Sequence, residues 1–136
     1  MELQVGVKVL LRNKEGKFLM VRRSPKKYPE VGPKWDIVGG SIEPGSSLME
    51  NLKREIREEV SLEMAGTPVL VAAQDILRVS GKHIVRLTYT GIIDGSPKID
   101  EDHSEWKWFT LDELKALSEQ DLDGYFKELL DKGVFG

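Results

Sequence analysis

The sequence predicts an α/β fold in which a β-sheet packs between helices. Three observations support this: segments with the alternating pattern of strands, a long amphipathic segment near the middle of the chain, and two shorter helical segments at its end. At 136 residues the chain has the length of one domain with a substantial core. We therefore expect a single domain over residues 1–136.

The first third of the chain predicts three strands and a loop. Residues 3–11 alternate apolar and polar side chains, which predicts a strand with one apolar face. Residues 18–21 are uniformly apolar, as in a strand that is covered on both faces. Residues 22–34 contain three prolines and predict a loop. A short strand over residues 35–38 then leads into a pair of glycines.

The helix over residues 48–60 is the best-defined element. Ser47 is a suitable N-cap, and Glu50 three residues later completes a capping box. On a helical wheel the apolar side chains fall in one arc. These side chains are Leu48, Met49, Leu52, Ile56 and Val60.

The second half of the chain predicts three more strands and two helices. The strands cover residues 69–79, 84–93 and 105–109, and the first two form a hairpin around a turn that contains glycine. Thr110 caps a helix with leucines on its buried side. A last helix ends at Gly133.

Three glutamates lie at the edge of the apolar arc of the 48–60 helix. Glu59 falls inside this edge, Glu55 just beyond it, and Glu58 a little further on. An ionised carboxylate at the margin of a core is costly unless it is paired or binds a metal. Carboxylate oxygens are ligands that a hard divalent cation such as Mg²⁺ prefers. Acids at this spacing also occur on ordinary charged helices, so the spacing alone leaves both interpretations open.

The residues around these acids form a longer pattern over residues 40–62. It consists of Gly40, the pairs Arg54-Glu55 and Glu58-Glu59, and the aliphatic side chains Ile56 and Leu62. This pattern resembles the signature box of the Nudix hydrolases. Two positions depart from the family: Ser46 stands where the family has its first Glu, and Ser61 stands where it has Gly.

The resemblance implies a fold, a reaction and a cofactor. The fold is a Nudix-type α/β/α sandwich with a mixed β-sheet that covers the whole chain. The reaction is hydrolysis of a diphosphate bond in a nucleoside di- or triphosphate derivative, such as a non-standard nucleoside triphosphate or ADP-ribose. The cofactor is Mg²⁺, for which Mn²⁺ can substitute.

The resemblance also implies roles for individual residues. The metal ligands are Glu55, Glu59, Glu58 and the carbonyl of Gly39, and Gly40 lets the loop approach phosphate closely. Catalysis involves these acids together with Arg54, which holds the carboxylates in place.

Because Ser46 cannot pair with Arg54, we expect Arg54 to turn to Glu50 or Glu58, with Glu43 as a further candidate. Nudix enzymes often supply another acid from the loop before the 105–109 strand.

In that loop Asp102 is the best match as a metal ligand, and Glu101 and Glu105 are the next candidates. A solvated acidic turn is the alternative for this loop. We expect His103 to be a polar residue of this loop without a role in the site.

Two substrate contacts are expected near residues 22–35. Arg22 and Arg23 alternate faces of a strand, and we favour Arg23 for phosphate over a solvated role. Trp35 could stack on a base, although a Trp at the start of a strand more often packs in a core.

The composition indicates where the protein acts and what kind of partner it binds. There are no cysteines, no apolar run long enough to span a membrane and no signal-peptide pattern, so we expect a cytoplasmic protein without a membrane association. The net charge of −3 gives no basic field for nucleic acid, so the expected partner is a small-molecule nucleotide. The sequence also allows a homodimer.

Two other functions are compatible with the same fold. A Nudix domain with little activity could serve as a nucleotide sensor or partner-binding module, and Ser46 is the one feature that favours it. An isomerase acting on a prenyl diphosphate would need further catalytic residues, and the lack of cysteine counts against it.

Overall fold

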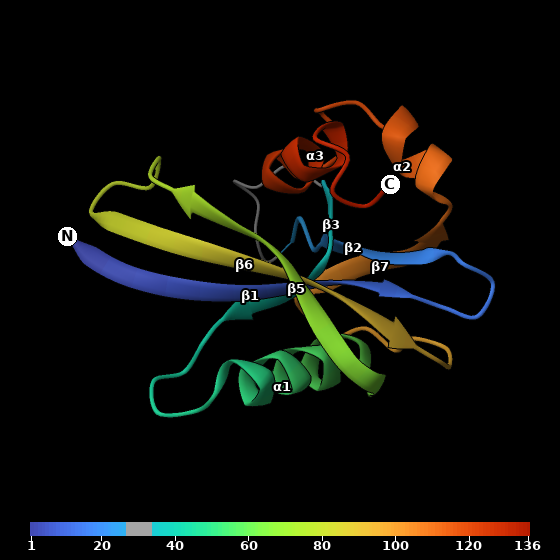
Figure 1. Ribbon diagram of the computed structural model, residues 1–136, viewed down its shortest axis with the longest axis horizontal. Helices are drawn as coiled ribbons and strands as arrows, with labels where there is room; N and C mark the ends of the chain where they lie inside the picture. Colours follow the sequence, from blue (N-terminus) through green and yellow to red (C-terminus); the bar gives the residue numbers. More distant parts are fainter. Residues whose placement is uncertain (27–33) are drawn as a thin grey trace.

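A computed structural model describes residues 1–26 and 34–136 and shows a mixed sheet with helices on both faces (Figure 1). Helix α1 covers one face, and helices α2 and α3 cover the other. The strands are β1 (Glu2–Arg12), β2 (Phe18–Arg23), β3 (Trp35–Asp36), β4 (Val38–Ser41), β5 (Met64–Ile76), β6 (Lys82–Ile93) and β7 (His103–Phe109). The helices are α1 (Leu48–Val60), α2 (Leu111–Ala116) and α3 (Gly124–Asp131). The predicted α/β/α sandwich with a mixed sheet is confirmed.

Strand β1 lies at the centre of the sheet. The strand order is β3-β2-β1-β6-β5, with β4 paired to β1 and β7 paired to β2. β1 runs parallel to β6 and antiparallel to both β2 and β4. Its antiparallel pairing with β4 places Lys8 directly opposite Gly39. This register brings a lysine from the start of the chain to the glycine pair.

The short strand predicted over residues 35–38 is two strands. β3 pairs with β2, whereas β4 pairs with β1, and the chain crosses from one partner to the other at the buried Ile37. β2 continues to Arg23, two residues further than predicted. Most of the predicted loop at 22–34 lies outside the described residues, because the structure describes nothing between 26 and 34.

The predicted hairpin is formed by β5 and β6. β5 begins at Met64 and ends at Ile76, so it starts and ends earlier than the predicted 69–79 strand. Its pairing with β6 shifts register between Ala65 and Val69 and again between Leu70 and Ala72. Such bulges interrupt the regular alternation on which the prediction depended.

Helix α1 has the bounds that the sequence predicts. The Ser47 side chain accepts a hydrogen bond from the Glu50 N–H at 3.1 Å, which confirms the N-cap. Ser61 ends the helix with φ 57° and ψ 37°, the left-handed conformation in which the family has glycine. The apolar face of α1 packs on the sheet through the fully buried Leu52 and Ile56.

A second core lies on the other face of the sheet, under α2 and α3. It includes the fully buried Ile37 and Phe126 together with Trp35. Thr110 and Glu113 form both halves of a capping box at the start of α2. No helix in the two described ranges is long and apolar enough to cross a lipid bilayer.

Candidate functional site

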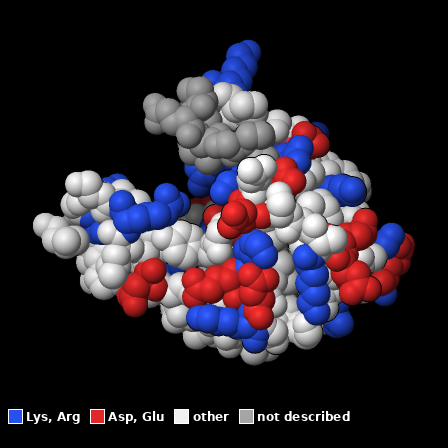
Figure 2. Space-filling view, turned by 90° about the horizontal axis from the view of Figure 1, so that it is seen from above, with Lys and Arg blue, Asp and Glu red and all other residues white. Residues whose placement is uncertain are grey.

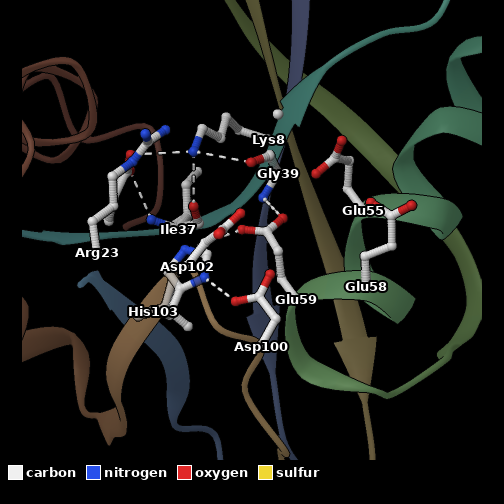
Figure 3. Close-up of a pocket in the computed structure, with 13 residues that line it drawn as sticks. Lys8, Arg23, Ile37, Gly39, Glu55, Glu58, Glu59, Asp100, Asp102 and His103 are labelled. Carbon is white, nitrogen blue, oxygen red and sulfur yellow. Dashed lines mark hydrogen bonds and ion pairs between the residues drawn. The ribbon is translucent and has the colours of Figure 1, made fainter. Parts of the chain in front are cut away.

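A pocket of about 230 Å³ lies where α1, β4 and the start of β7 meet (Figure 3). Its lining is dominated by ionisable side chains from six parts of the chain. These side chains are Lys8, Arg23, Asp36, Glu55, Glu58, Glu59, Asp100, Asp102 and His103. The pocket therefore offers many acids and two permanent cations to anything that enters it.

The three glutamates of α1 reach the pocket with increasing exposure. The side chain of Glu59 is 8% exposed, that of Glu55 is 15% exposed and that of Glu58 is 61% exposed. This is the order in which the helical wheel places them relative to the apolar arc. The N–H of Gly39 donates a hydrogen bond to Glu59 Oε2 at 2.9 Å, which ties the end of α1 to β4.

Glu59 is the most strongly perturbed acid of the pocket. Burial raises the pKa of Glu59 to about 9, because the charged form loses its hydration. The positive charge of Lys8 acts in the opposite direction, and the negative charge of Glu55 raises the pKa further. Around neutral pH Glu59 therefore retains its proton unless a cation compensates its charge.

The two glycines of β4 are required by close approach. Gly39 has φ +142°, and a Cβ there would lie 2.0 Å from the carbonyl oxygen of Val7. A Cβ on Gly40 would lie 2.8 Å from Glu55 Oε2. Both distances are too short for a side chain, so glycine at these positions lets the backbone of β4 approach β1 and the α1 carboxylates.

Arg54 holds the exposed side of the acid cluster. Its Nη2 donates to Glu55 Oε1 at 2.8 Å, its Nη1 lies 3.2 Å from Glu43 Oε2, and its Nε lies 3.7 Å from Glu58 Oε1. The expected contact with Glu58 is present, whereas Glu50 is not among the partners of Arg54. Glu43, from the loop before α1, supplies the charged contact that Ser46 cannot make.

Asn51 is a further buried partner of Arg54 that the sequence did not reveal. Arg54 Nη1 donates to Asn51 Oδ1 at 2.6 Å, and the same oxygen accepts the Glu43 N–H at 2.8 Å. The Asn51 amide also donates to the carbonyls of Ser46 and Ser47. Asn51 thus fixes the loop that delivers Glu43 to Arg54.

The segment before β7 contributes more than the predicted Asp102. Asp102 does line the pocket, and so does Asp100. His103 is not loop polarity: it begins β7, and its side chain is 9% exposed. Its Nδ1 lies 2.6 Å from Asp100 Oδ1 and its Nε2 lies 3.4 Å from Glu59 Oε1. The Asp100 N–H donates to the Glu59 carbonyl, which anchors this segment to the end of α1.

A buried charge network enters the pocket from the sheet, and sequence patterns did not reveal it. Lys8 Nζ donates to Asp36 Oδ2 at 3.2 Å, and Arg86 Nη2 lies 3.2 Å from Asp36 Oδ1. Arg86 also pairs with Asp123, the N-cap of α3. Burial raises the pKa of Asp36, but the charges of Lys8 and Arg86 outweigh it and lower this pKa to about 2.

The two neighbouring arginines of β2 have different surroundings. Arg23 lines the pocket, and its contact with phosphate stays a prediction. Arg22 pairs with Glu105 at 3.3 Å and stacks over the ring of Trp35 at 4.3 Å. Trp35 is 5% exposed, packs edge-on against Phe109 and does not line the pocket. This placement favours the packing alternative for Trp35 over stacking on a base.

The donor atoms of the pocket suit a hard divalent cation. Glu55 and Glu59 line the same pocket as Gly39, and the burial of Glu59 is costly unless a cation offsets its charge. As the side chains lie, no group of three Asp, Glu or His residues in the described ranges converges on one point. The exposed Glu58 would have to turn inward to join such a group.

Comparisons with known proteins point to one family. A family model described as the NUDIX domain matches residues 2–130. The crystal structure of a MutT protein from Methanosarcina mazei Go1 superposes with a TM-score of 0.81 at 26% identity, over 96% of this chain and 92% of that one.

Two sequence relatives share part of their length with this chain. A Mycobacterium tuberculosis protein provisionally named 8-oxo-dGTP diphosphatase 2 is 30% identical over 86 residues, which are 63% of this chain and 60% of that protein. The NAD-capped RNA hydrolase NudC of Stutzerimonas stutzeri is 30% identical over 117 residues, 84% of this chain and 40% of that protein. The chain thus spans less than two thirds of either curated relative. The match over residues 2–130, with the shared fold, shows that the chain belongs to the Nudix family.

Proposed function

We propose that this protein is a Mg²⁺-dependent pyrophosphohydrolase that cleaves a diphosphate bond in a nucleotide by attack of water at phosphorus. The observation that carries the proposal is that Glu55, Glu58 and Glu59 line one pocket together with the Gly39-Gly40 backbone. This arrangement has a chemical use in a family that hydrolyses nucleoside diphosphate derivatives. A domain without catalytic activity would gain nothing from a buried glutamate that lowers its stability.

Each pocket residue has a role in this proposal. Glu55, Glu59 and the Gly39 carbonyl would hold the cation, with Glu58 and Asp102 supporting it. When bound, Mg²⁺ would neutralise phosphate charge and acidify a water molecule. Arg23 would bind a phosphate oxygen, since it is one of the two permanent cations in the lining.

His103 and Asp100 would orient Glu59 from the buried side of the pocket. His103 Nδ1 lies 2.6 Å from Asp100 Oδ1, and His103 Nε2 faces Glu59 Oε1 at 3.4 Å. Asp100 would fix the imidazole ring, and the ring would in turn hold the Glu59 carboxylate toward the cation.

For the substrate, we propose an oxidised or otherwise non-standard nucleoside triphosphate, with ADP-ribose as the second class to test. The name of the M. tuberculosis relative and the similarity to a MutT structure support the first class. On the face shown in Figure 2, the acidic and basic side chains of the described residues are interspersed and form no broad basic surface. This supports a small nucleotide rather than a polynucleotide as partner. Mn²⁺ substitution, a cytoplasmic location, a homodimer and a single domain over 1–136 with its box at 40–62 remain predictions.

The contacts of Arg54 count against the alternative of a nearly inactive sensor domain. Ser46 was the feature that favoured it, because Arg54 would lack its acidic partner. Glu43 lies 3.2 Å from Arg54 and fills that role from the loop.

The test is a release assay on a panel of nucleotides with Mg²⁺ and with EDTA. The panel contains 8-oxo-dGTP, dGTP, ADP-ribose and NAD⁺, and nucleoside monophosphate and pyrophosphate are separated by chromatography. We expect Mg²⁺-dependent release from 8-oxo-dGTP, with cleavage between the α- and β-phosphates. Absence of release from every nucleotide by the folded protein would refute the proposal.

A further inference from the structure

The ammonium of Lys8 is enclosed by oxygen atoms of this chain. Its Nζ donates to Asp36 Oδ2 at 3.2 Å, to the Ile37 carbonyl at 3.1 Å and to the Gly39 carbonyl at 3.4 Å. An ammonium has three protons, so these three acceptors account for all of them. Lys8 is therefore a fixed internal cation of the pocket and not a side chain aimed at an incoming ligand (Figure 3).

Gly39 and Lys8 position one another. They are direct partners across β1 and β4, and Gly39 has φ +142°. A Cβ on Gly39 would lie 2.7 Å from Lys8 Cα and 2.9 Å from Lys8 Cδ. The missing side chain at Gly39 thus makes the room in which the aliphatic stem of Lys8 lies, and the ammonium folds back over the carbonyl of the same glycine.

Asp36 and the residues paired with it hold the ammonium of Lys8 in place. Asp36 accepts from Lys8 with one carboxylate oxygen and from Arg86 with the other, and Arg86 is tied to Asp123 at 3.2 Å. The side chain of Lys8 is 14% exposed and that of Arg86 is 6% exposed. Charges alternate along this chain of four residues, and its positive end faces the pocket.

We infer that Lys8 is a positioning residue that limits the affinity of the pocket for a divalent cation, because its ammonium and the cation share the Gly39 carbonyl oxygen. This inference rests on the metal site of the proposed function. A positive charge beside a shared ligand opposes a second cation strongly when both are shielded from water. The Gly39 carbonyl oxygen accepts from Lys8 Nζ at 3.4 Å, so Lys8 would weaken the binding of a cation that uses the same oxygen.

The test measures Mn²⁺ binding without nucleotide, from the electron paramagnetic resonance signal of free Mn²⁺. Lys8→Met removes the charge and keeps an unbranched apolar stem, and we expect it to bind Mn²⁺ about tenfold more tightly than wild type. Lys8→Arg keeps the charge and should stay within about threefold of wild type. Lys14→Met is the matched control for net charge, since Lys14 is 80% exposed and pairs with Asp94 away from the pocket, and it should also stay within about threefold.

A second variant moves the affinity in the other direction. Asp36→Asn leaves Lys8 without its anionic partner, so the positive charge at the pocket grows and Mn²⁺ binding should weaken about tenfold. If Lys8→Met fails to fold by circular dichroism, Lys8→Gln, which also removes the charge, replaces it in the test. Unchanged or weaker binding in a folded Lys8→Met, or unchanged or tighter binding in Asp36→Asn, would overturn the inference.

Glu59→Gln separates this inference from the proposed metal site. It should abolish Mn²⁺ binding. If it does so while Lys8→Met binds as wild type does, only the role of Lys8 is wrong. If wild type shows no binding that Glu59→Gln removes, the metal site itself is wrong and the inference falls with it.

Discussion

Replacing Glu59 by glutamine should stabilise the metal-free protein and abolish its activity. The carboxyl has an ordinary pKa of 4.5, which burial raises to about 9 in the folded state. A group whose pKa is raised on folding contributes stability that is fully present below pH 4.5 and is lost as the pH rises towards about 9. At neutral pH the loss amounts to about 3 kcal/mol, at 1.36 kcal/mol for each pH unit above 4.5. Glutamine does not ionise, so the variant escapes this loss.

The assay is urea unfolding of wild type and Glu59→Gln in EDTA at several pH values. Near the ordinary pKa of Glu59 the two proteins should have similar free energies of unfolding. With rising pH wild type should fall progressively below the variant, by about 3 kcal/mol around neutral pH. Saturating Mg²⁺ should stabilise wild type but not the variant, because the variant lacks a ligand.

Two results would refute this reasoning. One is a variant that is less stable than wild type in EDTA at neutral pH, which would mean that the Glu59 charge is already compensated by the protein. The other is a gap between the two proteins that does not change with pH. Either outcome would show that burial does not dominate the ionisation of Glu59.

Four further substitutions test other parts of the site. Glu43→Gln should lower kcat/KM about threefold, since the pair is partly exposed, and Ser46→Glu in the same protein should restore it; no rescue would mean that Ser46 cannot reach the arginine of the box. Gly40→Ala places a Cβ 2.8 Å from Glu55 Oε2 and should lower kcat/KM about tenfold or more with little change in Tm, and an unaffected rate would contradict the close approach. Trp35→Ala should lower the free energy of unfolding by about 3–5 kcal/mol in a urea titration. A stable Trp35→Ala with impaired substrate binding would restore the stacking role.

The helix that carries the acids was predictable because the sequence signals that define it are local. Periodicity fixed its face, Ser47 fixed its start, and the wheel ordered the burial of Glu59, Glu55 and Glu58 correctly. These signals all lie within one turn or a few turns of chain. The same holds for the cap at Thr110.

The other half of the pocket depends on pairing between distant strands. Lys8 reaches Gly39 only through the antiparallel register of β1 and β4, and Arg86 reaches Asp36 only because β6 lies beside β1. Nothing in the pattern around either residue specifies those partners. Alternation did show that Lys8 is on the opposite face from Val7 and Val9, but it could not show what that face meets.

His103 and Trp35 show two other limits of sequence patterns. The acidic run before β7 resembles a solvated turn, yet the backbone bond from Asp100 to the Glu59 carbonyl pulls the run onto the end of α1 and buries His103. Trp35 precedes Gly39 by four residues, but the switch of partners between β3 and β4 directs it into the opposite core. In both cases a tertiary contact decides the placement.

We expect the acids of α1 to carry Mg²⁺-dependent hydrolysis. The most direct measurement compares turnover of Glu59→Gln with that of Glu50→Gln, at saturating Mg²⁺, on the best nucleotide of the panel. Both variants lose one negative charge from the same helix, but Glu50 is exposed at its first turn and does not line the pocket. Glu59→Gln should lose about 100-fold or more in turnover while Glu50→Gln stays near wild type. Near-native turnover by a folded Glu59→Gln, or equal losses in both variants, would contradict the assignment of this pocket as the active site.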